Sequence, residues 1–238
     1  MNSRNLIAAA TVLLAAGALP WVASEFLQSL ALACLMYIAL ATSWSMFCGA
    51  TRYLSLATSA FFGVGAYTSA VLLGVLPWPL VVASGALVAA VIAVVMGAAV
   101  LHLRGTYFAV LTFGMTELIR HAITYVEKQV SGTVGRVLTV VPEGATVYLT
   151  LLLIAALSIG AALWVKKSRF GLALAGIGAD EQRAQTLGVD TRRVKIAGFA
   201  LSALFAGAVG AAMAVRWAYI EPSAVFNPFL GFQTVVIA

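Results

Sequence analysis

Two oppositely charged residues, Glu117 and Arg120, stand inside a long apolar stretch that covers 105–126. In an α-helix their spacing puts both on one face, where carboxylate and guanidinium can form an ion pair. A membrane-crossing helix would carry them into the outer third of a hydrocarbon core about 30 Å thick. With Thr112 and Thr116 they could line a translocation route. The alternative is a structural ion pair, or side chains that extend to the outer surface.

The residue patterns that carry out chemical reactions are missing from this sequence. It has neither a phosphate-binding loop of the G-x-x-x-x-G-K-S/T type nor an H-E-x-x-H zinc motif. His102 and His121 fall near opposite faces of the predicted membrane, too far apart to share a metal ion. Cys34 and Cys48 lie in or beside apolar segments without metal-ligand spacing. The sequence therefore predicts no enzyme active site, no metal and no cofactor.

The segment 166–195 is the longest basic stretch, and it separates two apolar runs. Basic loops between membrane spans stay in the cytoplasm. The segment also has internal order, because 180–187 begins with acidic residues and is followed by glycine, which suits a short capped helix. A loop lying on anionic lipid is the alternative, but it does not account for these helix signals. The basic residues are Lys166, Lys167, Arg169, Arg183, Arg192, Arg193 and Lys195.

Composition predicts an all-α, polytopic transmembrane helical bundle. Hydrophobic residues make up 63% of the chain and charged residues 9%, and the mean hydropathy is +1.04. A soluble domain has roughly one-quarter charged residues. The net charge of +6 is concentrated in short loops, which indicates the positive-inside bias and no nucleic-acid partner.

At about 20 residues per crossing, the apolar runs predict seven spans and the start of an eighth near Phe229, in a single domain over 1–238. With 166–195 inside, ten of the fourteen Lys and Arg residues lie in the cytoplasm, and so does the N-terminus. The segment 127–145 would be external and irregular. The eighth run stops early, so we expect the chain to be truncated at its C-terminus. The predicted spans are 6–23, 27–47, 54–73, 78–101, 105–126, 146–165 and 196–215.

The first predicted span has a second interpretation, as a cleaved signal peptide that ends near Val22-Ala23-Ser24. In the third span the small residues Ser55, Ser59 and Gly63 are spaced four apart, and Gly65 is added to the same predicted helix contact. Such a face favours close contact with a neighbouring helix. It could also mark a place where the helix breaks to line a cavity.

In four ordered blocks from about residue 37 onward, the chain resembles the LivM-type permease subunits of bacterial branched-chain amino acid ABC importers. The first block is Leu54-Ser55-Leu56 with 60–67, and the second is 103–107 with Thr112, Gly114, Glu117 and Arg120. The third is Ser168-Arg169-Phe170-Gly171 with Asp180-Glu181 and 184–188. The fourth comprises Lys195, Phe199, Ser202-Ala203, Ala206-Gly207, Gly210-Ala211 and Pro222.

The resemblance implies a type II-like importer permease in the bacterial inner membrane. It would pair with a second permease, a LivH-type paralogue or an identical subunit, and would bind two cytoplasmic ATPases that hydrolyse ATP. A periplasmic protein would deliver substrate. The short helix would couple ATP hydrolysis to transport, with Ala184 and Leu187 on its buried face. The residues implied in coupling are Ser168, Arg169, Phe170, Gly171, Asp180, Glu181, Ala184, Leu187 and Gly188.

The chain departs from the family pattern at Arg52-Tyr53, at Ala57-Thr58 and at Gln182-Arg183. These departures leave leucine-type substrates, urea and other small amides open. A secondary transporter or a channel subunit is the alternative function. Such a protein would be expected to carry a coupling acid or a broken helix near the membrane midplane.

Overall fold

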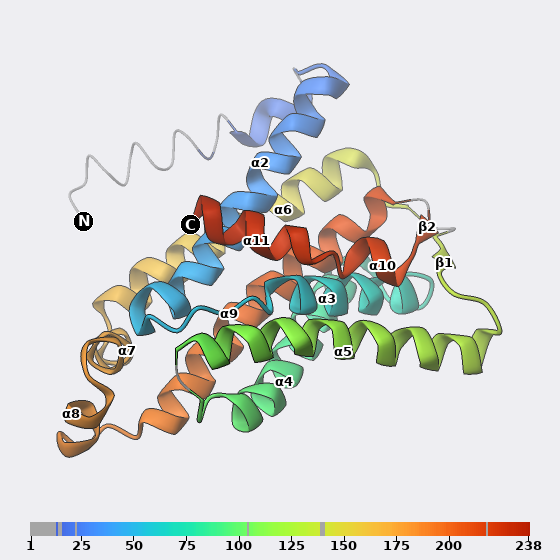
Figure 1. Ribbon diagram of the computed structural model, residues 1–238. Coiled ribbons are helices and arrows are strands. Elements are labelled where there is room, and N and C mark those ends of the chain that lie inside the picture. The colour runs from blue at the N-terminus through green and yellow to red at the C-terminus, as the bar shows by residue number, and fades with distance from the viewer. Residues whose placement is uncertain (1–12, 14–15, 22, 104, 139–140, 218) are drawn as a thin grey trace.

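In the computed structural model the described residues are 13, 16–21, 23–103, 105–138, 141–217 and 219–238. They form a helical bundle with a two-stranded antiparallel pair at one end (Figure 1). The helices are α2 (Glu25–Trp44), α3 (Thr58–Leu72), α4 (Trp78–Val100), α5 (Thr106–Ser131), α6 (Gly144–Lys167), α7 (Arg169–Ala179), α8 (Glu181–Thr186), α9 (Thr191–Met213), α10 (Pro222–Val225) and α11 (Pro228–Ile237). The shorter elements are the π-helical η1 (Ser45–Gly49), the 3₁₀ turn η2 (Ala214–Arg216), β1 (Arg136–Val137) and β2 (Tyr219–Ile220).

The structure confirms the all-α membrane fold. Within the described residues, four helical segments are long and apolar enough to cross a membrane: Glu25–Gly49, Trp78–Val100, Gly144–Lys167 and Thr191–Arg216. The third predicted span is the 15-residue α3, and the fifth is the 26-residue but more polar α5. Their crossing stays a prediction. Most of the predicted span 6–23 lies outside the described residues. The same holds for Arg4 and Arg104, which are predicted to be cytoplasmic.

Connecting segments gather at two ends of the bundle (Figure 1). At one end, Lys195 of α9 donates hydrogen bonds to the Leu101 carbonyl after α4 and to the Tyr53 hydroxyl before α3. At the other end, the Tyr67 hydroxyl of α3 donates to Glu127 of α5. The segments 127–145 and 166–195 lie at different ends of the bundle (Figure 1), and the side of a membrane that each occupies stays a prediction.

Small residues bring α3, α4 and α9 into backbone contact at the centre of the bundle. A methyl group on Gly65 would overlap the Gly207 carbonyl oxygen, and one on Gly210 would overlap the Phe62 carbonyl oxygen. On α4, a methyl group on Gly85 would lie 2.7 Å from Ala211 Cβ. Glycine therefore replaces a side chain wherever two of these helices cross, as expected for membrane helices packed by small residues.

The basic segment contains more helix than the one piece, 180–187, that the sequence predicts. Ser168 ends α6 and begins α7, because its hydroxyl oxygen accepts a hydrogen bond from the Gly171 amide over 3.1 Å. The eleven residues that follow form a helix that buries Leu174 and Ile177 and leaves Leu172 exposed, and α9 starts at Thr191, five residues earlier than predicted. The basic segment is therefore a pair of helices with short connections.

The segment 127–145, which the sequence predicts to be external and irregular, is also more regular than predicted. α5 continues to Ser131, where Gly132 adopts a left-handed conformation with φ of 71°, and β1 then pairs with β2. In that pair Arg136 lies opposite Ile220. The short strand 136–137 was not predictable from two residues, because its partner lies more than 80 residues later in the chain.

Candidate functional site

The helix α8 (Glu181–Thr186) lies within one residue, at each end, of the predicted piece 180–187. Asp180 Oδ1 accepts hydrogen bonds from the amides of Gln182 and Arg183 over 3.0 and 3.1 Å, so its carboxylate caps the N-terminus. Gly188 has φ of 85°, the left-handed conformation that commonly follows a helix end. The structure therefore contains a short helix with both ends defined, at the tip of the hairpin that α7 and α8 form (Figure 1).

The two residues predicted to share the buried face of α8 lie in different surroundings. Ala184 is 4% exposed and packs within the chain itself, whereas Leu187 is 83% exposed. Ala184 is therefore unavailable to a partner, and its part in the predicted contact needs correction. The helix is only six residues long, and Leu187 already adopts a non-helical backbone at its C-terminal boundary. This is why the i, i+3 rule fails here.

Sequence reasoning missed how α8 is held against the bundle. Glu181, the first residue of α8, forms an ion pair with Lys195 in α9 over 2.7 Å between Oε1 and Nζ, and both side chains are nearly fully buried. The Tyr53 hydroxyl donates a hydrogen bond of 2.8 Å to Glu181 Oε2. The signal available in the sequence was a lysine at the start of an apolar helix, which is costly without a partner.

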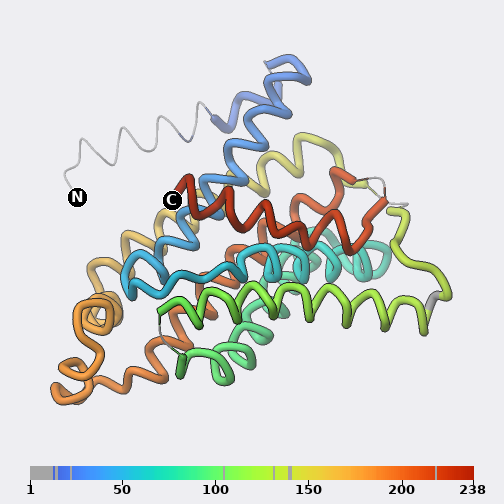
Figure 2. Tube along the Cα trace, in the orientation of Figure 1, coloured from blue at the N-terminus to red at the C-terminus, as the bar shows by residue number. Residues whose placement is uncertain are grey.

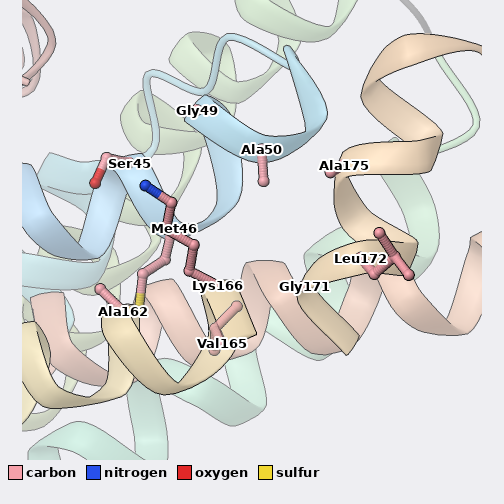
Figure 3. Close-up of a pocket in the computed structure, with 10 residues that line it drawn as sticks. All are labelled: Ser45, Met46, Gly49, Ala50, Ala162, Val165, Lys166, Gly171, Leu172 and Ala175. Carbon is pink, nitrogen blue, oxygen red and sulfur yellow. The ribbon is translucent and has the colours of Figure 1, made fainter. Parts of the chain in front are cut away.

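A cavity of about 450 Å³ lies between η1, the end of α6 and α7. Figure 3 shows the Lys166 side chain extending from α6 towards η1, with Met46 and Leu172 among the apolar residues that line the cavity. Ser45 and Lys166 are its polar side chains. A lining of this kind binds apolar groups and has no pair of residues that could act as nucleophile and base.

Glu117 and Arg120 form the ion pair that their spacing predicts. Arg120 Nη2 lies 2.5 Å from Glu117 Oε2, and both side chains are 29% exposed. His121 Nε2 lies 3.9 Å from the same carboxylate oxygen. Arg120 and His121 also line a hollow of about 190 Å³ with Glu221. Arg120 is therefore accessible from the end of the bundle that carries β1 and β2.

Thr112 and Thr116 do not extend this polar surface as predicted. Thr112 is buried, and its hydroxyl donates to the Ala109 carbonyl while accepting from the Leu56 amide over 3.1 Å. The Thr116 hydroxyl, also buried, donates to the Thr112 carbonyl. Threonine hydroxyls in helices commonly bond to the preceding turn. Here the Thr112 hydroxyl also satisfies an amide in the non-helical segment before α3.

The small residues of the third predicted span divide into two groups. Ser59, Gly63 and Gly65 lie in α3 and allow close approach: Gly63 faces the Phe226 ring and Gly65 faces α9. Ser55 lies outside the helix, where its carbonyl accepts a hydrogen bond from the Trp44 indole over 2.9 Å. The predicted contact face is therefore wrong for Ser55. Arg52, with φ of 59°, turns the chain out of the preceding helix.

A second buried carboxylate, Glu127, was also missed. It accepts hydrogen bonds from the Tyr67 hydroxyl and the Gly135 amide, each over 3.0 Å, and from Arg136 Nε over 3.2 Å. This network fixes the end of α5 to α3 and to β1. Within the part of the chain that the structure describes, no three His, Cys, Asp or Glu residues are placed to hold a metal ion.

Comparison with known proteins gives a consistent family relationship. The family model for the branched-chain amino acid transport system permease component matches residues 26–238. Two proteins named high-affinity branched-chain amino acid transport system permease protein LivM, from Escherichia coli (strain K12) and Salmonella typhimurium (strain LT2), are each 27% identical over 247 residues. Each alignment covers 89% of this chain and 57% of the relative, so the chain spans less than two thirds of the length of these relatives.

No solved structure matches the chain. The family match nevertheless begins at the second residue of α2 and includes every later helix, the Glu117–Arg120 pair and α8. Four of the described helical segments are long and apolar enough to cross a membrane, which agrees with this family. The chain belongs to the permease component family of branched-chain amino acid transport systems.

Proposed function

We propose that this chain is a transmembrane permease subunit of an ATP-driven importer and forms part of the route for branched-chain amino acids or a related small substrate. The observation that carries the proposal is α8, a capped helix that protrudes from one end of the bundle and exposes Leu187. Two cytoplasmic ATPases would bind this end, and a periplasmic binding protein would deliver substrate at the other. A LivH-type permease would pair with the chain in the bilayer.

The exposed Leu187 gives α8 a means of binding a cleft on another protein. Its neighbours Gln182, Arg183 and Gln185 are polar and exposed, so the side chain is an isolated apolar contact on a hydrophilic tip. Full burial of such a side chain contributes about 1.5–3 kcal/mol. A contact of this size is useful only if the tip is firmly attached to the bundle, and the buried Glu181–Lys195 pair supplies that attachment.

The translocation route would lie along α5, which runs beside α3 on one face of the bundle (Figure 2). One side of α5 exposes Tyr107, Val110 and Leu118, and a hollow of about 780 Å³ lies beside Tyr107 and Gly114. Further along the same helix, the Glu117–Arg120 pair would provide the polar part of the route. If the second permease packed against the exposed side of α5, this surface would be enclosed between the two subunits.

Copurification tests the proposal. The tagged chain, expressed with the proteins encoded beside it and extracted from membranes, should bring down an ATPase and a second permease, identified by mass spectrometry. Leu187→Glu should remove the ATPase and abolish uptake while the second permease stays bound, because a charge would enter the apolar contact. Arg192→Gln, an exposed change in the same segment, should leave both intact. Uptake that depends on an ion gradient and needs no ATPase would favour the secondary-transporter alternative.

A further inference from the structure

The ion pair between Glu181 and Lys195 differs from the other ion pairs of the basic segment. Its two side chains are 9% and 5% exposed, and its partners lie fourteen residues apart on different helices. The pairs Asp180–Arg183 and Asp190–Arg193 are local, and the arginines are 85% and 88% exposed. Only the buried pair, among these three, connects α8 to a long helix of the bundle.

Lys195 also reaches a third element. Its Nζ donates a hydrogen bond to the Leu101 carbonyl, which follows α4, over 2.8 Å. A lysine ammonium has three donors in fixed relative directions. With donors directed to Glu181 and to Leu101, the positions of α8, α9 and the end of α4 depend on one another.

Tyr53 adds the segment before α3 to the same network. Its hydroxyl donates to Glu181 Oε2 over 2.8 Å and accepts from Lys195 Nζ over 3.3 Å, and Nζ lies 4.9 Å from the centre of its ring. Its ring also packs edge-on against Phe108 of α5, with centroids 5.3 Å apart. One cluster of three side chains therefore contacts α5, α8 and α9, the segment before α3 and the end of α4.

A buried charged cluster is an expensive way to hold a short helix in place. Removing two charges from water costs several kcal/mol per ion, and apolar residues of similar volume often give equal or greater stability. A charged cluster makes the relative orientation of the helices specific, because its hydrogen bonds are satisfied in only one orientation. An apolar contact would allow α8 to slide across the bundle.

We infer that Glu181, Lys195 and Tyr53 are positioning residues that transmit movement of α8 to the ends of α4 and α9 and to the segment before α3. The inference rests on the proposed function, in which an ATPase moves α8. Leu187 makes the external contact, and the cluster converts its displacement into movement of the bundle. Without the cluster, the ATPases would still bind and hydrolyse ATP, but hydrolysis would no longer produce transport.

The test uses the complete transporter reconstituted in vesicles, with ATP hydrolysed per substrate imported as the readout. In the double variant Glu181→Met and Lys195→Met, no charge is stranded, so assembly with the ATPases should persist. The ratio should rise at least about fivefold, the lower end of typical couplings between sites. Tyr53→Phe removes one hydroxyl, folds with less disturbance, and should raise the ratio in the same direction.

Arg193→Met is the matched control, because it removes an exposed positive charge from the same segment. It should leave the ratio unchanged, and an equal rise would overturn the inference. If Tyr53→Phe binds the ATPases and hydrolyses as much ATP per substrate imported as the wild type, the inference is also overturned. If the double variant does not accumulate in the membrane, Tyr53→Phe alone decides the test. Failure of the wild-type chain to bind ATPases would instead contradict the proposed function itself.

Discussion

The Tyr67 hydroxyl donates a hydrogen bond to Glu127 Oε2 over 3.0 Å and so joins the middle of α3 to the last turns of α5. The same carboxylate also accepts from the Gly135 amide and from Arg136, and its side chain is 3% exposed. Removing the Glu127 carboxylate leaves three donors without this acceptor, whereas removing the Tyr67 hydroxyl removes one hydrogen bond. The loss of the carboxylate should therefore lower the free energy of unfolding more than the loss of the hydroxyl.

We expect Glu127→Ala to lower the free energy of unfolding by about 3 kcal/mol, the range found when one partner of a buried ion pair is removed. Tyr67→Phe should cost about 1 kcal/mol, as for a single hydrogen bond. Thermal unfolding of the detergent-purified chain measures both. Glu143→Ala, an exposed change in the same external region, is the control and should stay within about 0.5 kcal/mol of wild type. Equal effects of Glu127→Ala and Glu143→Ala would contradict the network's role.

The Glu117–Arg120 pair should behave as a coupled unit. Either single alanine variant strands a partly buried charge, so each should reduce the abundance of the chain in membranes more than the double variant does. Immunoblotting of membrane fractions gives the three values, and Lys128→Ala, an exposed change further along the same helix, serves as the control. Strictly additive losses would show that the pair does not contribute as a pair. Unchanged abundance with reduced uptake would instead favour a role in the route.

The positive-inside bias predicts that 166–195 is cytoplasmic and 127–145 is external. Single cysteines at Thr133 and Thr186, both exposed, report the two sides in a chain that carries Cys34→Ala and Cys48→Ala. An impermeant thiol reagent added to spheroplasts should label the Thr133→Cys variant, and it should label Thr186→Cys only after the membrane is opened. The reverse pattern would invert the topology.

Gly65 is a position where added volume should be poorly tolerated. A methyl group there meets the Gly207 backbone, which cannot move away as a flexible side chain can. Gly65→Ala should therefore destabilise the chain by about 2 kcal/mol, a typical cost of overpacking. Gly114→Ala, in a helix with open space around the added methyl, is the matched control and should be neutral or stabilising. Thermal unfolding that ranks the two variants equally would show that α3 and α9 separate easily.

The elements that the sequence predicts well are those specified by local patterns. The apolar runs locate α2, α4, α6 and α9, and the acidic start and glycine end locate α8 to within one residue. The Glu117–Arg120 pair follows from the helical repeat alone. In each case the determining residues are neighbours in the chain, so no knowledge of the packed bundle is needed.

The failures come from contacts between distant residues. Ser55 leaves the predicted helix because Trp44 and Thr112 supply hydrogen bonds to that segment, and Ala184 is buried by helices that precede and follow α8. The roles of Glu181 and Glu127 depend on Lys195 and Tyr67, which are 14 and 60 residues away. Composition shows that such charges need partners, but only the packed chain shows which partners they find.

The glycine contacts among α3, α4 and α9 have a mechanical consequence for alternating access. Where backbone touches backbone, as at Gly65 with Gly207 and Gly210 with Phe62, a large displacement of one helix along another would bring side chains against the neighbouring backbone. We therefore expect these three helices to move together, with little change of shape inside the trio. A pathway through this chain would then open and close by movement of the elements around the trio, above all α5. The contacts of α5 with α3 and α4 are few.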